Sequence, residues 1–145
     1  MYGELAHILT FAERYFVEIY SDDSMNHAAV LSANYLYFVY TQDSYLKAIV
    51  SASPRHGPSK AVSKFLTTGE VWGFRNAFAH GQWRYVGSGR HPDIEYREDG
   101  KKEGRILILT PEKLQLWHWL SRTVLGLWAA RIAYLRQPIQ HPGHS

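Results

Sequence analysis

Residues 71–83 read VWGFRNAFAHGQW, and within this stretch the chain changes from a helical to an extended pattern. Arg75, Asn76 and His80 interrupt an otherwise apolar segment at helical spacing. Gly81 follows directly, where a glycine in the left-handed conformation commonly ends a helix. Because cationic and amide groups are costly to bury without a partner or a function, the stretch predicts a helix end that carries a candidate site.

Helical geometry relates the three polar residues to one another. Asn76 and His80 lie about 40° apart around the helix and share one face. Arg75 and His80 differ by about 140° and about 7.5 Å of rise, so both can address one point only in a groove between helices. The helix dipole favours a protonated His80, whereas a nearby Arg75 favours the neutral ring, a balance that suits proton transfer near neutral pH. An arginine and a histidine at this spacing more often have a structural role, so the pair alone does not establish a function.

The composition is that of one globular domain. The chain has 145 residues, of which 46% are hydrophobic and 14% aromatic, enough to bury a core. It contains no cysteine, which excludes disulfides and thiolate metal sites and fits a cytoplasmic location. A net charge of +3 permits a polyanionic partner without requiring one.

We expect no membrane span. The first residues, MYGE, lack the basic and apolar regions of a signal peptide. The two most apolar windows, residues 29–50 and 114–135, are interrupted by charged or titratable side chains, which argues for packed helices. These side chains are Asp43, Lys47, His118, Arg122 and Arg131.

Apolar spacing predicts helices at residues 3–20, 25–52 with a bend near 41–44, 59–80 and 111–136. In the third helix, Gly69 and Gly73 indicate a kink or a close approach by another backbone. Thr110 and Pro111 form a strong start for the last helix. The inward residues expected on the third helix are Val62, Phe65, Leu66, Val71 or Trp72, and Phe78. The last helix has one apolar stripe (Leu114, Trp117, Val124, Trp128, Ile132 and Leu135) and a second one (Leu116, Leu120 and Leu127) for a further contact, such as a partner subunit.

Three short runs with strand character lie between the last two helices, at residues 83–86, 94–97 and 105–109. Glycine-containing turns separate them, which predicts an antiparallel hairpin or three-stranded flap at about residues 83–109. The expected fold is therefore all-α, a bundle of four to five helices with a small β insertion before the last long helix. Residues 1–136 would form the single domain and residues 137–145 a flexible tail.

The segment from Arg75 to His80 resembles the arginine–four residues–histidine motif of HEPN-domain proteins, a helical family that includes many prokaryotic RNase toxins. Asn76 after the arginine and Ala79 before the histidine also agree, as do the place of the motif late in the third helix and the long closing helix. The resemblance implies cleavage of RNA by attack of the ribose 2′-OH on the adjacent phosphate, without a metal or other cofactor. It also implies a homodimer whose two motifs line a shared cleft, in a toxin–antitoxin or phage-defence setting, with an antitoxin or regulatory protein as a further partner.

Under this resemblance each residue of the motif has a role. His80 would remove or deliver a proton. Arg75 would hold the phosphate and stabilise the charge of the transition state. Asn76 would orient His80 or donate to a phosphate oxygen.

The sequence departs from one branch of the family and leaves other interpretations open. That branch has a tyrosine two residues after the histidine, where this chain has Gln82. The alternatives are a non-catalytic HEPN-like module that binds RNA, a nucleotide or a protein partner in the same groove, and a purely structural role for Arg75 and His80. No phosphate-binding glycine loop, histidine metal pair or serine hydrolase motif is present. The scattered histidines are expected at surface or capped positions: His7, His27, His56, His91 and His118.

Overall fold

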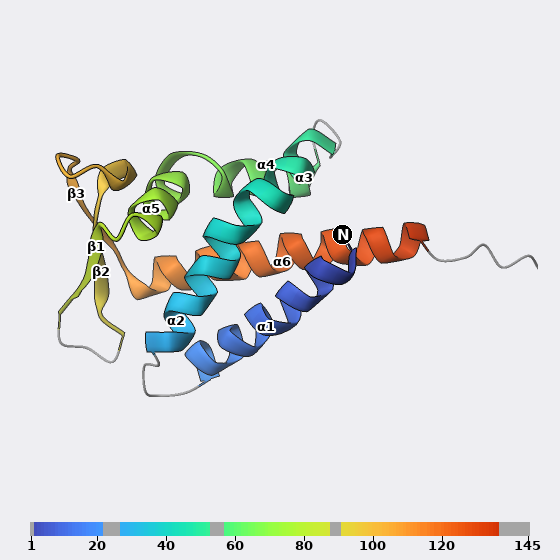
Figure 1. Ribbon diagram of the computed structural model, residues 1–145, viewed down its shortest axis with the longest axis horizontal. Helices are drawn as coiled ribbons and strands as arrows, with labels where there is room; N and C mark the ends of the chain where they lie inside the picture. Colours follow the sequence, from blue (N-terminus) through green and yellow to red (C-terminus); the bar gives the residue numbers. More distant parts are fainter. Residues whose placement is uncertain (1, 22–26, 53–56, 88–90, 137–145) are drawn as a thin grey trace, which may run out of the picture.

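The chain folds into a helical bundle with a small sheet at one end (Figure 1). The computed structural model describes residues 2–21, 27–52, 57–87 and 91–136. Helix α1 (Tyr2–Ser21) packs against both α2 (His27–Asn34) and the long α6 (Pro111–Arg136). The expected helical fold with a β insertion is confirmed at this level, whereas the expected flexible tail lies outside the described residues.

The second helix is continuous from His27 to Ala52 but changes its winding. It begins as α2, passes through the π-helical segments η1 (Tyr35–Tyr40) and η2 (Gln42–Leu46), and ends as α3 (Lys47–Ala52). The bend expected near residues 41–44 falls within this π-helical part. Turns of this kind are wider than α-helical turns and often occur at functional sites, and here they lie opposite the candidate motif.

The prediction of one helix over residues 59–80 is wrong, because the structure divides this stretch in two. Helix α4 (Pro58–Leu66) ends at Thr67, and α5 (Gly69–Ala79) starts two residues later. The separation occurs at Gly69, whose φ of 57° is readily adopted only by glycine.

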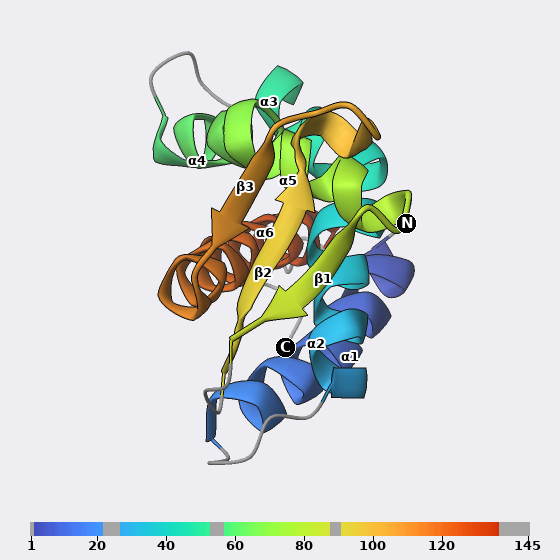
Figure 2. The same ribbon diagram turned by 90° about the vertical axis from the view of Figure 1, so that its left-hand side faces the viewer.

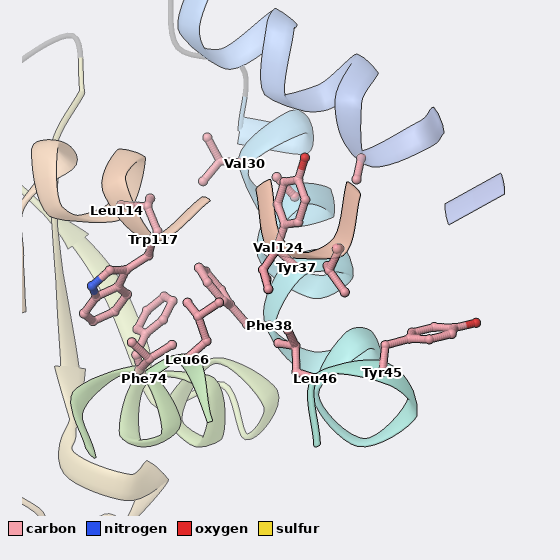
Figure 3. Close-up of a cluster of buried hydrophobic side chains, with 14 of the residues drawn as sticks. Val30, Tyr37, Phe38, Tyr45, Leu46, Leu66, Phe74, Leu114, Trp117 and Val124 are labelled. Carbon is pink, nitrogen blue, oxygen red and sulfur yellow. The ribbon is translucent and has the colours of Figure 1, made fainter. Parts of the chain in front are cut away.

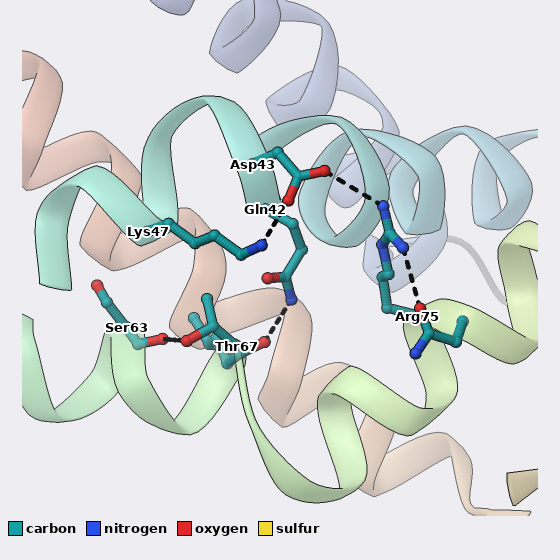
Figure 4. Close-up of polar contacts among 8 residues, drawn as sticks. Gln42, Asp43, Lys47, Ser63, Thr67 and Arg75 are labelled. Carbon is teal, nitrogen blue, oxygen red and sulfur yellow. Dashed lines mark hydrogen bonds and ion pairs between the residues drawn. The ribbon is translucent and has the colours of Figure 1, made fainter. Parts of the chain in front are cut away.

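Side chains satisfy the carbonyl groups that this break exposes (Figure 4). The Thr67 hydroxyl donates to the carbonyl of Ser63 at 2.8 Å. The amide of Gln42, which is fully buried in η2, donates to the carbonyl of Leu66 at 2.6 Å. Because buried carbonyls at a helix end are costly when unpaired, these bonds stabilise the break and tie α4 to the π-helical segment.

Within the described residues, strands β1 (Trp83–Val86), β2 (Asp93–Arg97) and β3 (Ile106–Leu109) form one antiparallel sheet in the order β1-β2-β3. The register places Tyr96 opposite both Trp83 and Leu107. Figure 2 looks onto this sheet, which covers one end of the bundle. The predicted flap is therefore confirmed as a three-stranded sheet.

The core joins helices and sheet through a group of aromatic rings (Figure 3). The Phe74 ring lies 5.9 Å from that of Phe38, 6.0 Å from that of Trp117 and 5.3 Å from that of Tyr96. Trp117 is 1% exposed, as the first stripe of the last helix predicts. Phe65 is 46% exposed and Leu135 is 68% exposed, so their expected inward positions are wrong.

The second stripe of the last helix is largely uncovered in the single chain. Leu116 is 50% exposed and Leu127 is 60% exposed, whereas Leu120 is partly buried against the core.

No helix among the described residues combines the length and the apolar character that crossing a membrane requires.

His118 occupies a fully buried position in α6 and is capped on both ring nitrogens. The Tyr20 hydroxyl lies 2.6 Å from its Nδ1, and its Nε2 lies 2.7 Å from Oδ1 of Asn34. A neutral ring with its proton on Nε2 donates to Asn34 and accepts from Tyr20. Burial lowers the pKa of His118 to about 3. The residue is therefore a neutral core histidine that links α1, α2 and α6.

Candidate functional site

The end of α5 has the conformation that the sequence predicts. The helix closes at Ala79, and the backbone N–H of the capping residue His80 donates to the carbonyl of Asn76 at 3.0 Å. Gly81 then takes a φ of 68°, and Gln82 donates to the carbonyl of Ala77 at 2.8 Å. These bonds lead the chain from α5 directly into β1.

The Arg75 side chain is 18% exposed and points toward the second helix. Its Nη1 donates to Oδ1 of Asn76 at 3.0 Å, and its Nη2 lies 3.5 Å from Oδ2 of Asp43 (Figure 4). Its guanidinium carbon lies 5.0 Å from the centre of the Trp72 ring. The buried Nε atom has no hydrogen-bond partner among the described residues. Contacts with Asn76, Asp43 and Trp72 thus fix the orientation of the Arg75 side chain, while its Nε–H remains without an acceptor among the described residues.

Asp43 in η2 faces Arg75 and also pairs with Lys47 one turn further on. Lys47 Nζ lies 2.8 Å from Oδ1 of Asp43. The hydrogen bond from Lys47, with the charges of Lys47 and Arg75, outweighs the effect of burial and lowers the pKa of the Asp43 carboxyl. The pair of cations therefore keeps Asp43 ionised.

His80 lies on another side of α5 and is exposed to solvent. The turn η3 (Glu98–Gly100) packs against it: a Cβ atom on Gly100 would come within 3.1 Å of Cδ2 of His80 and 2.8 Å of the Asn76 carbonyl oxygen. Gly73 meets the same turn, because its Cβ position lies 3.2 Å from Oδ1 of Asp99. The β insertion therefore approaches Gly73 closely, through the side chain of Asp99 and not through its backbone.

The structure brings Arg75 and Asn76 together but does not bring His80 to Arg75. Their side chains follow the wide separation that helical geometry predicts, Arg75 toward η2 and His80 toward η3. Among the described residues no hydrogen bond joins the two side chains. His80 is an exposed cap residue of α5, and η3 packs against it.

An open depression of about 410 Å³ begins directly after His80, on the outer side of the sheet. Arg97 borders it and donates to the carbonyl of Gly104 at 3.3 Å, while Arg84 borders it and is paired with Glu95 at 2.6 Å. The remaining lining residues are Gly81, Gln82, Trp83, Tyr96 and Ile106. The charged side chains that line the depression are thus two arginines and one glutamate.

Metal-binding side chains do not gather at this site. Over the described ranges, no group of three or more His, Cys, Asp or Glu residues is placed to hold a metal ion. The polar side chains of the motif are those of Arg75, Asn76 and His80, an anion-binding fork, an amide and an imidazole.

Sequence reasoning missed three contributors to the Arg75 environment: Asp43, Lys47 and Trp72. Asp43 and Lys47 are visible in the sequence as charges that interrupt an apolar window, with the four-residue spacing of a helical ion pair. Their position beside Arg75 depends on the packing of the second helix against α5, which the spacing does not encode.

Comparisons with models of protein families, with curated proteins and with solved structures gave no match for this chain. The assignment of a function consequently rests on the motif and on the geometry around it.

Proposed function

We propose that the chain is a metal-independent endoribonuclease of the HEPN type that acts on RNA as a homodimer in the cytoplasm, in a toxin–antitoxin or phage-defence setting. The observation that carries the proposal is the orientation of Arg75. Its side chain is 18% exposed, and its Nε has no hydrogen-bond partner among the described residues. The exposed imidazole of His80 lies five residues further on, at the cap of the same helix.

The proposed reaction needs one base, one acid and a cation at the phosphate. The ribose 2′-oxygen loses its proton to an imidazole and attacks phosphorus, and the bond from phosphorus to the 5′-oxygen breaks. The leaving 5′-oxygen takes a proton from an imidazolium, which leaves a 2′,3′-cyclic phosphate and a 5′-hydroxyl. Arg75 would stabilise the charge on the non-bridging oxygens, and His80 would transfer the protons.

The separation of Arg75 from His80 within one chain supports a dimeric site. Two copies of His80 facing each other would supply the base and the acid, and each Arg75 would reach a phosphate held between the subunits. An uncovered apolar groove is available for such a contact, because Phe11 is 50% exposed and Tyr35 is 50% exposed on its walls.

The test is cleavage of a mixed RNA pool in the presence of EDTA by the wild type, Arg75→Ala and His80→Ala. We expect products ending in 2′,3′-cyclic phosphate from the wild type and a loss of about 100-fold or more in each variant. His91→Ala, which changes a histidine that lines neither the depression nor the apolar groove, is the matched control and should cleave normally. Equal cleavage by the wild type and His80→Ala would refute the proposal, and light scattering would show whether the active species is a dimer.

The alternative is a non-catalytic HEPN-like module that binds RNA, a nucleotide or a protein partner. The ion pair between Arg75 and Asp43 favours it, because a paired arginine can serve as a binding or bracing residue. Under this alternative no variant changes RNA cleavage, since the wild type has none, while Arg75→Ala still weakens RNA binding.

A further inference from the structure

Two cations from separate helices converge on one aromatic ring beside the candidate site. Lys47 Nζ and the guanidinium carbon of Arg75 each lie 5.0 Å from the centre of the Trp72 ring. Cations in such positions are attracted by the negative face of the indole. The ring therefore holds two positive charges close together although they repel each other.

Asp43 is the carboxylate that balances these charges. It contacts Lys47 at 2.8 Å and Arg75 at 3.5 Å, and its side chain is 60% exposed. In η2, Gln42 points inward to α4 and the adjacent Asp43 points outward. One acidic group thus occupies the space between two basic groups at the surface.

The contact between the Asp43 carboxylate and the Arg75 guanidinium is long and makes use of only one guanidinium nitrogen. Arginine binds carboxylates and phosphates best through two parallel hydrogen bonds, and Arg105 makes this contact with Glu98 at 2.8 and 2.9 Å. Arg75 has a single 3.5 Å approach to Asp43 and leaves its Nε unpaired among the described residues. Because the Asp43 carboxylate is 60% exposed and makes only this one long contact with Arg75, a competing anion can displace it.

We infer that Lys47 and Arg75 form a two-cation seat for a backbone phosphate of single-stranded RNA, and that Asp43 occupies this seat in the free protein. The inference rests on the proposed function, because it names the phosphate-binding residues of the same site. Lys47 and Arg75 bind the phosphate, and Trp72 positions both cations. The Asp43 carboxylate competes with the phosphate for the same two cations and moves away from them when RNA binds.

Binding of a labelled single-stranded RNA oligonucleotide with 2′-O-methyl groups tests the seat, because this RNA has no free 2′-OH and is not cleaved. We expect Lys47→Gln to weaken binding roughly 3- to 10-fold at low salt and to reduce the salt slope by about 0.7, the loss of one phosphate contact to a single strand. Asp43→Asn keeps the side-chain shape and removes the competing charge, so it should tighten binding roughly 2- to 5-fold.

Lys113→Gln is the matched control for the loss of a lysine. Lys113 also pairs with a carboxylate, Glu70 at 2.5 Å, and also lies over an indole, 5.7 Å from the centre of the Trp117 ring. No arginine is recorded over that ring in the described part of the chain. Its replacement should change RNA binding much less than Lys47→Gln does, although both remove one positive charge.

The inference is overturned if Lys47→Gln and Lys113→Gln weaken binding equally, or if Asp43→Asn weakens it. Circular dichroism melts of each variant show whether the fold is retained, and Lys47→Arg, which keeps the charge, should recover most of the affinity. The nuclease proposal is judged separately by cleavage of unmodified RNA. Binding that follows the expected order without any cleavage would leave the seat in place and refute the enzyme, whereas His80-dependent cleavage unaffected by Lys47→Gln would do the reverse.

Discussion

A Cβ atom on Gly100 would lie 2.8 Å from the carbonyl oxygen of Asn76, so the turn after β2 rests directly on the backbone of the candidate site. Gly100 also has a φ of 71°, which disfavours any residue with a Cβ. The β insertion is therefore not a separate appendage, since it supports the end of α5 from which Asn76 and His80 project.

Gly100→Ala should lower the free energy of unfolding through both the φ angle and the contact with Asn76. Gly87→Ala is the matched control, because Gly87 has a φ of 96° but no atom of the described residues within 4 Å of its Cβ position. We expect Gly100→Ala to cost about 1–3 kcal/mol more than Gly87→Ala in urea unfolding. Equal decreases in the free energy of unfolding would mean that the turn can move away from Asn76 at no energetic cost.

Phe74→Ala should destabilise the protein by about 3–5 kcal/mol, because it removes a buried ring that contacts the second helix, α6 and the sheet at once. Phe65→Ala, which removes the same side chain from a position that is 46% exposed, should cost less than about 1 kcal/mol. Thermal and urea unfolding of both variants measures the difference. Similar losses would contradict the central place of Phe74 in the core.

The free energy of unfolding should decrease as the pH is lowered below 6.5, because of His118. Its pKa is lowered from 6.5 to about 3 by burial, so below pH 6.5 the unfolded chain takes up a proton that the native ring does not. The expected slope from this group is about 1.4 kcal/mol per pH unit, present between pH 6.5 and 3 and absent above pH 6.5.

Urea unfolding of the wild type and of His118→Gln at pH 7.5, 6.0 and 5.0 tests this dependence. The glutamine variant has no titrating ring, so its stability should fall less steeply over this interval even if it is lower throughout. Parallel pH profiles for the two proteins would show that His118 is protonated in the native state or does not control the dependence.

Thr110→Ala should cost about 1 kcal/mol, because the Thr110 hydroxyl accepts a hydrogen bond from the backbone N–H of Lys113 at 3.3 Å at the start of α6. Thr110→Ser keeps the accepting oxygen and should lose much less. Urea unfolding compares the two, and equal losses would show that the methyl group rather than the cap carries the effect.

Local signals in the sequence were sufficient for the elements that depend on short-range physics. The capping group Thr110 and Pro111 marks the start of α6, and alternating residues with glycine turns mark the three strands. Gly81 marks the end of α5 because its backbone conformation is one that few other residues adopt. The site residues Arg75, Asn76 and His80 could be selected in the same way, as polar groups in an apolar helix end.

Other features needed partners distant in sequence. The pattern around Phe65 and Leu66 favours burial of both, yet only Leu66 meets the core, because α4 turns one face to the bundle and the neighbouring position lies toward solvent. In the sequence His118 does not differ from the other scattered histidines. Its role as a core residue follows only from the contacts of its two ring nitrogens with Tyr20 and Asn34.

The sequence by itself determined where the three strands lie, where α6 starts and which helix end carries the polar motif, because capping, apolar periodicity and glycine conformation act over a few residues. Only the tertiary structure decided that Arg75 faces Asp43, Lys47 and Trp72 while His80 faces Gly100. Those neighbours come from the packing of the second helix and the β insertion onto α5, and packing depends on the shape and burial of residues that are far apart along the chain.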